Sequence, residues 1–166
     1  MVNLPAPLLT LRRCSAGDET AMRELDGEEA ERWRSSREAL QALELSEEEA
    51  EKVLKRAFGW ATQIWWRDSK VCEVPAQGQV EAVIQFLDSV GVRGPDATKM
   101  IKRFPEMCAC DVEEQLRENM AKLERDWKIK GPTAANVIKR QPQVLGYVID
   151  CQGNCEGQCN RCWVRL

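Results

Sequence analysis

Residues 92–107 read VRGPDATKMIKRFPEM, and residues 129–144 read IKGPTAANVIKRQPQV. The two stretches are offset by 37 residues and share seven of sixteen positions: the Gly-Pro pair, an alanine, Ile-Lys-Arg and a second proline. A fixed period of this length is typical of helical-repeat proteins, in which each unit is a small helical motif that stacks on the next. The repeat therefore predicts the fold.

Each copy of the repeat has a physical interpretation. Its glycine allows a turn, and the proline after it suits the first position of a helix, where no amide hydrogen is needed. A short helix follows, and the second proline, Pro105 or Pro142, ends it by clashing with the preceding turn. A longer helix is expected before each Gly-Pro pair, because apolar residues recur there at helical spacing. These are Val80, Val83, Ile84, Leu87 and Val90 in the first copy, and Val112, Leu116, Met120, Leu123 and Trp127 in the second.

The segment before the repeats also indicates helices. Ser46 is followed three residues later by Glu49, which is a helix-start signal. Apolar residues at helical spacing follow it, so we predict one helix over about 46–66. Lys55-Arg56-Ala57-Phe58 resembles Lys102-Arg103-Phe104-Pro105, which suggests a degenerate copy of the unit at 46–60, although the proline is missing.

No segment alternates with a period of two, so the predicted fold is all-α: a short α-solenoid of stacked helical repeats with a C-terminal cysteine-rich loop. The predicted organisation follows from these motifs. It comprises an N-terminal extension at 1–19, N-terminal helices at 20–70, a linker at 71–79, two repeats at 80–149 and a cysteine-rich tail at 150–166.

The composition excludes several kinds of protein. The chain has 166 residues and no histidine, so neither a Ser-His-Asp triad nor an imidazole-ligated metal site can be built. The longest apolar run, 57–66, is too short to span a membrane, which takes about 18 residues. Neighbouring carboxylates lie at polar helix starts, where they favour capping over acid–base chemistry. We therefore expect a protein that is not an enzyme.

The second unit reads VEEQLRENMAKLERDWKIKGPTAANVIKRQPQVL over 112–145. The unit begins with a helix that starts Val-Glu and continues with a glycine-containing turn. A short helix with a basic pair follows, and then a proline and an apolar tail. In this pattern, residues 80–149 resemble repeats of the mitochondrial transcription termination factor family. The resemblance implies an α-solenoid of mitochondria or chloroplasts whose basic residues contact DNA or organellar RNA. It also implies a regulator of transcription, RNA processing or ribosome assembly, and it brings no catalytic residues.

Four cations occupy equivalent positions in the two copies: Lys102 and Arg103 in the first, Lys139 and Arg140 in the second. They are candidates for contact with nucleic acid or with a partner protein, because lysine and arginine neutralise phosphates. The alternative is that they are exposed cations favoured by the negative end of the helix dipole. The net charge of -3 favours this alternative, since nucleic-acid-binding domains are usually basic.

The strongest chemical signal is the tail CQGNCEGQCNRCW. Its cysteines Cys151, Cys155, Cys159 and Cys162 suit an all-thiolate site for zinc or an iron–sulfur cluster. Only three residues separate Cys155 from Cys159, whereas structural zinc sites usually join two pairs about 12–20 residues apart. Two disulfides or buried thiols are the alternatives, and Cys108 and Cys110 are conceivable substitute ligands.

Three tryptophans follow one another in 60–66. Trp65 fits the apolar stripe of the helix expected there, so it is assigned to the core. Trp60 and Trp66 lie off that stripe and are candidates for an exposed docking face, because tryptophan is enriched at interface hot spots.

Two repeats are few, because about three units are generally needed for stability. With the acidic charge, this predicts a non-catalytic accessory or scaffolding subunit of a large assembly. The family resemblance implies that this assembly is organellar: a photosynthetic or respiratory complex, a ribosome or a polymerase. Its partners would be protein subunits, with membrane association only peripheral and through such a complex. A DNA- or RNA-binding regulator is the alternative, and a small redox or iron–sulfur protein is a third.

Overall fold

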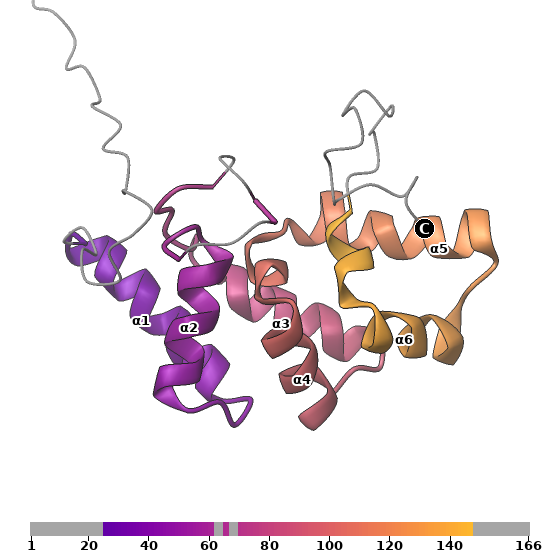
Figure 1. The fold of residues 1–166 in the computed structure, drawn as a ribbon, viewed down its shortest axis with the longest axis horizontal. Coiled ribbons are helices and arrows are strands. Elements are labelled where there is room, and N and C mark those ends of the chain that lie inside the picture. Colours follow the sequence, from indigo (N-terminus) through magenta and orange to yellow (C-terminus); the bar gives the residue numbers. More distant parts are fainter. Residues whose placement is uncertain (1–24, 62–64, 67–69, 148–166) are drawn as a thin grey trace, which may run out of the picture.

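The computed structural model describes residues 25–61, 65–66 and 70–147, which form a row of paired helices (Figure 1). The α-helices in these ranges are α1 (Gly27–Gln41), α2 (Glu47–Ala57), α3 (Gln79–Ser89), α4 (Pro95–Arg103), α5 (Glu118–Trp127) and α6 (Gly131–Arg140). Three shorter elements are η1 (Pro105–Ala109), η2 (Val112–Arg117) and η3 (Pro142–Gly146). The described residues contain no strand, and the prediction of an all-α helical-repeat fold is confirmed.

The helices form three successive pairs, and each pair joins a helix of the row α1, α3, α5 to the helix after it. The short helices bury equivalent positions of the repeat. These are Ala50, Val53 and Leu54 in α2, Ala97, Met100 and Ile101 in α4, and Ala134 and Ile138 in α6. The pair α1–α2 is therefore a first unit in front of the two that the sequence repeat identifies. With three units the stack reaches the usual minimum number.

The short helices α4 and α6 end in the same way. Phe104 and Gln141, which follow their last turns, have φ/ψ of -135°/73° and -131°/68°. A proline comes next in both, and it keeps the preceding residue out of the helical region. The chain then tightens into the 3₁₀ turns η1 and η3. The predicted proline stops thus account for both helix ends.

The helix predicted over about 46–66 is wrong in its C-terminal half, because α2 ends at Ala57. Gly59 has φ +77°, and the amide of Trp60 donates to the carbonyl of Lys55 at 2.8 Å, which is the helix-ending Schellman arrangement. A Cβ on Gly59 would lie 2.2 Å from the carbonyl oxygen of Lys70, so only glycine fits this turn. The apolar run continues past Gly59 although the helix does not.

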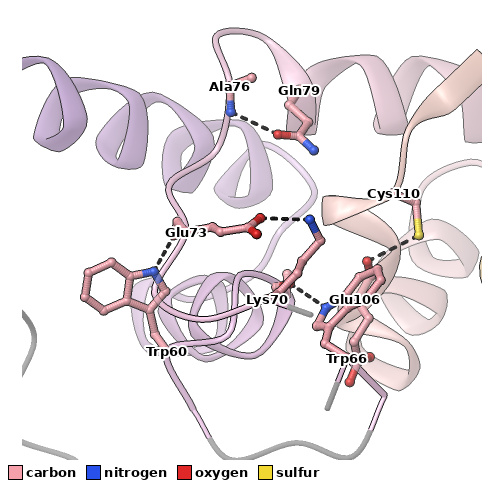
Figure 2. Close-up of polar contacts among 9 residues, drawn as sticks. Trp60, Trp66, Lys70, Glu73, Ala76, Gln79, Glu106 and Cys110 are labelled. Atoms are coloured by element: carbon pink, nitrogen blue, oxygen red, sulfur yellow. Dashed lines mark hydrogen bonds and ion pairs between the residues drawn. The ribbon is translucent and has the colours of Figure 1, made fainter. Parts of the chain in front are cut away.

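The residues after this turn fold back on the first unit (Figure 2). The indole Nε1 of Trp60 donates to the carbonyl of Glu73, and that of Trp66 donates to the carbonyl of Ala57 at 2.7 Å. Lys70 pairs with Glu73 at 2.8 Å and lies 5.1 Å from the ring centre of Trp66. Trp66 is only 4% exposed, so the expectation that it forms part of an exposed docking face is wrong. The expectation assumed that Trp66 lies on a helix, but α2 ends before it, so its place relative to the apolar stripe does not predict its exposure.

One apolar core runs from Trp33 to Tyr147. Trp65 crosses between units, because its ring lies 4.6 Å from that of Phe104 and stacks at 6.2 Å on that of Tyr147. A Cβ on Gly146 would lie 2.6 Å from the Phe104 ring and 2.7 Å from the Trp65 ring. The segment after α2 therefore ties the first unit to the second and third.

The last long helical segment, η2 and α5, differs in two ways from the helix predicted there. Its first turns, η2, are π-helical, and the side chain of Asp111 caps them by accepting from the amide of Glu114 at 2.7 Å. Leu116 and Leu123 are buried as expected, but Trp127 is 51% exposed. The prediction of a core position for Trp127 is wrong, because about half of its side chain is exposed at the last residue of α5.

Candidate functional site

Two of the predicted contact cations join neighbouring units to each other. The Nζ of Lys102 in α4 lies 2.7 Å from the carboxylate of Glu49 in α2, and the Nζ of Lys139 in α6 lies 2.8 Å from that of Asp96 in α4. Lys102 and Lys139 are equivalent in the repeat, and their partners lie in the first turns of the preceding short helices. The same ion pair is therefore made twice along the stack.

Both acceptor carboxylates are stabilised in their charged form. The hydrogen bond from Lys102 is the largest cause that lowers the pKa of Glu49, and the backbone amide of Ser46 adds to it. The hydrogen bond from Lys139 likewise lowers the pKa of Asp96, with a further contribution from the charge of Lys99. The sites are exposed, so water screens these interactions and each pair contributes little to stability alone.

Arg103 and Arg140 stay available to solvent. Both guanidinium groups are exposed, and within the ranges the structure describes neither forms an ion pair or a hydrogen bond. Lys99 lies one turn before Arg103 on α4, and is also exposed. In α2 the equivalent positions hold Lys52 and Arg56, so the cations recur on corresponding faces of the short helices. We call Lys52, Arg56, Lys99, Arg103 and Arg140 the cation stripe.

The arginine of the first unit has a different environment. The Nε of Arg56 donates to Oε1 of Glu106 at 2.7 Å, and Glu106 is only 1% exposed. The backbone carbonyl of Glu106 also accepts from the thiol of Cys110 at 3.5 Å (Figure 2). Sequence reasoning missed Glu106; the available signal was an acid inside the apolar turn PEMCA, which becomes buried once η1 packs on α2.

The metal prediction rests on residues beyond those described. Cys151, Cys155, Cys159 and Cys162 lie outside the described residues, so the zinc or iron–sulfur site stays a prediction. Among the described residues, no group of three or more cysteine, aspartate or glutamate side chains is arranged to hold a metal ion. Cys108 is fully buried, and desolvation, followed by the charge of Glu106, raises the pKa of its thiol to about 12. A thiol that stays protonated is a poor substitute ligand.

The tryptophan candidates are placed as follows. Trp66 is in the core, as described above. Trp60 is partly buried and packs edge-on against Trp33 with 5.5 Å between ring centres. Its structural role is therefore clear, and a role in docking stays a prediction.

Stacked helix pairs with equivalent buried positions define the chain as an α-solenoid repeat protein. A family model described as mTERF matches residues 34–154, so the chain belongs to the mTERF family, the mitochondrial transcription termination factor family that the repeats resemble. No curated protein and no solved structure matches the chain. In the described part of the chain, no helix has the length and apolar character needed to cross a membrane.

Proposed function

We propose that this protein is a non-catalytic regulator of organellar gene expression that binds the phosphate backbone of DNA or RNA through the cation stripe. Membership of the mTERF family supports both the organelle and the nucleic acid. The observation that carries the proposal is that two exposed arginines, Arg103 and Arg140, recur at equivalent repeat positions and have no acidic partner among the described residues. Cations at helix C-termini also interact favourably with the helix dipole, but that role does not require an arginine in each unit.

The local charge distribution supports binding despite the net charge of -3. Residues 18–56 carry 13 acids and 7 bases, whereas residues 91–166 carry 10 acids and 13 bases, so the excess of acids lies in the N-terminal part. Two acids in the first turns of α2 and α4, Glu49 and Asp96, are already paired with Lys102 and Lys139. These two carboxylates therefore do not compete with a phosphate for the arginines on α4 and α6.

The test is binding of the full chain to a short DNA duplex and to single-stranded RNA of equal length, measured by fluorescence anisotropy over a salt series. Each phosphate contact contributes a slope of about -0.9 for duplex DNA and about -0.7 for a single strand in a plot of log affinity against log salt. We expect Arg103→Gln with Arg140→Gln to make the slope for duplex less steep by about 1.8, which is two contacts.

The matched control replaces two exposed arginines of the long helices, Arg34→Gln with Arg125→Gln, which makes the same change in charge. The control should bind like the wild type. Equal losses in the two double variants would show that only net charge matters. A folded wild-type chain without salt-dependent binding to either probe would contradict the proposed function.

A second candidate is an accessory subunit of a large organellar assembly. The exposed ring of Trp127 at the end of α5 favours it, because exposed tryptophan is typical of protein interfaces. Migration of the protein with a large complex on a native gel distinguishes the two. Migration that survives nuclease and is lost on Trp127→Ser supports the subunit, whereas migration that nuclease abolishes supports the nucleic-acid-binding protein.

A further inference from the structure

Glu106 is a buried acid that depends on one arginine. It follows Pro105 in η1, and its Oε1 accepts the 2.7 Å hydrogen bond from Arg56. Its second carboxylate oxygen, Oε2, is buried without a hydrogen-bond partner among the described residues. The adjacent Met107 and Cys108 are fully buried, so the surroundings of this carboxylate are apolar. An ionised carboxylate in such a place requires a compensating positive charge.

The third unit has no such acid. Gln143 occupies the repeat position of Glu106, directly after Pro142, and its Oε1 is also buried and has no hydrogen-bond partner in the described part of the chain. Gln143 is only partly buried, unlike Glu106, and it carries no charge. Arg103 precedes Gln143 by one unit, just as Arg56 precedes Glu106 by one unit. Arg103 makes no ion pair within the described ranges. The difference between Glu106 and Gln143 thus coincides with the difference between a paired and an unpaired arginine.

We infer that Glu106 is a positioning residue that withdraws Arg56 from the cation stripe, so that the phosphate contacts come from α4 and α6. This inference rests on the proposed function. The Arg56 guanidinium is half exposed, and it lies near enough to the surface to reach a phosphate. Moving it to a phosphate would leave the Glu106 carboxyl group without its ion-pair partner in an apolar turn. One exposed phosphate contact does not repay that loss, because interactions of exposed charges are weak and screened by salt.

The position of the binding surface follows from this. Lys99, Arg103 and Arg140 belong to the second and third units, and they define its central and C-terminal part. The first unit contributes structure through the pair Arg56–Glu106, since α2 packs more extensively on η1 than on any other element. A ligand backbone is therefore expected to follow α4 and α6 and to make no ionic contact with Arg56.

The first experiment is Glu106→Gln, tested by circular dichroism for folding and by anisotropy against a short DNA duplex over a salt series. Glutamine has the shape of the glutamate side chain and leaves Arg56 without an ionic partner. We expect the slope of log affinity against log salt to become steeper by about 0.9, as one more phosphate is contacted. Adding Arg56→Gln to this variant should return the slope to the wild-type value.

The double variant Arg56→Gln with Glu106→Gln also serves if Glu106→Gln alone does not fold. Removing both charges at once leaves no buried charge without its partner, which is the costly result of breaking a buried ion pair at one side only. A wild-type slope in the double variant supports the inference, while Arg103→Gln alone should reduce the slope by about 0.9. A double variant that loses one contact would show that Arg56 binds phosphate in the native protein and would overturn the inference.

The failure of the proposed function looks different in the same experiment. If the wild-type chain shows no salt-dependent binding to the duplex, then the nucleic-acid function itself is wrong. If the wild type binds and the double variant has lost a contact, then the function stands and the role of Glu106 is wrong.

Discussion

At the scale of single residues, the two neighbouring cations of each repeat have different environments. Lys102 and Lys139 pair with acids of the preceding unit, whereas Arg103 and Arg140, one residue further on, are exposed and unpaired in the described part of the chain. Lysine and arginine adjacent on a helix point in different directions, so neighbouring cations do not share one environment. A basic pair in the sequence therefore contains one residue for stacking and one for the surface.

The ion pairs between units should make stability depend on pH. Glu49 and Asp96 have pKa values below their ordinary values of 4.5 and 3.8, because Lys102 and Lys139 donate hydrogen bonds to them. A carboxyl group whose pKa is lower in the folded than in the unfolded chain stabilises the folded state. This stabilisation is fully present above the pKa of the unfolded chain, and it is lost as the pH falls through the pKa of the folded chain. We expect the double variant Glu49→Gln with Asp96→Asn to lose less stability than the wild type when urea unfolding is measured from neutral pH to below pH 3.8.

Glutamine at position 49 can still accept from the amide of Ser46, so the helix cap is retained. The control is Glu48→Gln with Glu124→Gln, which removes two exposed acids that form no ion pair within the described ranges. Acid-induced losses that are equal in the wild type and the Glu49/Asp96 variant would mean that the ion pairs contribute nothing measurable.

At the scale of elements, local chemistry made the short helices predictable. The Gly-Pro starts and proline stops of α4 and α6 act within a few residues, and the structure has both helices where the repeat places them. The end of α2 escaped prediction because the Gly59 turn lies inside an apolar run that continues the helical spacing. The burial of Trp66 was not predicted, because it results from a segment that folds back on α2. The spacing of apolar residues gives no information about such a segment.

The candidate site was predictable to a similar degree. The positions of Arg103 and Arg140 at exposed helix ends follow from the repeat alone. The partners of Lys102 and Arg56 do not, because Glu49 is 53 residues and Glu106 is 50 residues away in the chain. Such pairs arise from the stacking of units, and a single sequence gives the period of the stack but not its geometry.

A buried amide side chain joins η3 to α5 and gives a test at this scale. The side-chain nitrogen of Asn119 donates to the carbonyls of Leu145 and Tyr147 at 2.8 and 2.9 Å, and Asn119 is fully buried. These carbonyls lie at the end of the last 3₁₀ turn and in the residue after it. We expect Asn119→Ala to reduce the free energy of unfolding by about 1–3 kcal/mol, because buried acceptors lose their donor.

The control for this variant is Asn136→Ala, an exposed asparagine of α6. It should change the free energy of unfolding by less than about 0.5 kcal/mol in the same urea titration, as exposed substitutions usually do. Equal effects of the two substitutions would show that the amide of Asn119 does not hold η3 in place.

At the scale of the whole molecule, the middle pair α3–α4 packs against described elements of both neighbouring units, whereas each outer pair has one neighbouring pair among the described residues. Helix α3 buries Val80, Val83, Phe86 and Leu87, whereas the only buried side chains of α5 are Asn119 and Leu123. At the other end, α1 buries only Trp33, Ser36 and Leu40, and most of its other residues are polar. Repeat stacks need polar outer faces on their terminal units to stay soluble. The largely polar surface of α1 gives the first described unit that character, whereas the exposed ring of Trp127 on α5 leaves an apolar side chain on the surface of the third.

A continuous core implies that the three units unfold together. The buried cluster runs without a break from the first unit to the third, and Trp65 contacts residues of the second and third units. Trp33, Trp60, Trp65 and Trp66 all belong to the first unit or the segment after it, so their fluorescence reports on that region. Far-ultraviolet circular dichroism reports on all the helices. In a variant with Trp127→Phe and Trp163→Phe, we expect the two signals to give the same urea midpoint, as cooperative unfolding requires.

Repeat proteins provide the contrary case, because contacts only between neighbours allow units to unfold one at a time. If the fluorescence changes at lower urea than the circular dichroism, then the first unit unfolds before the others and the Trp65 contacts are weaker than their geometry indicates. Gly146→Ala sharpens the test, since its Cβ would collide with Phe104 and Trp65 at the junction of the units. Such overpacking usually costs about 1–3 kcal/mol. In one cooperative structure it lowers both midpoints equally.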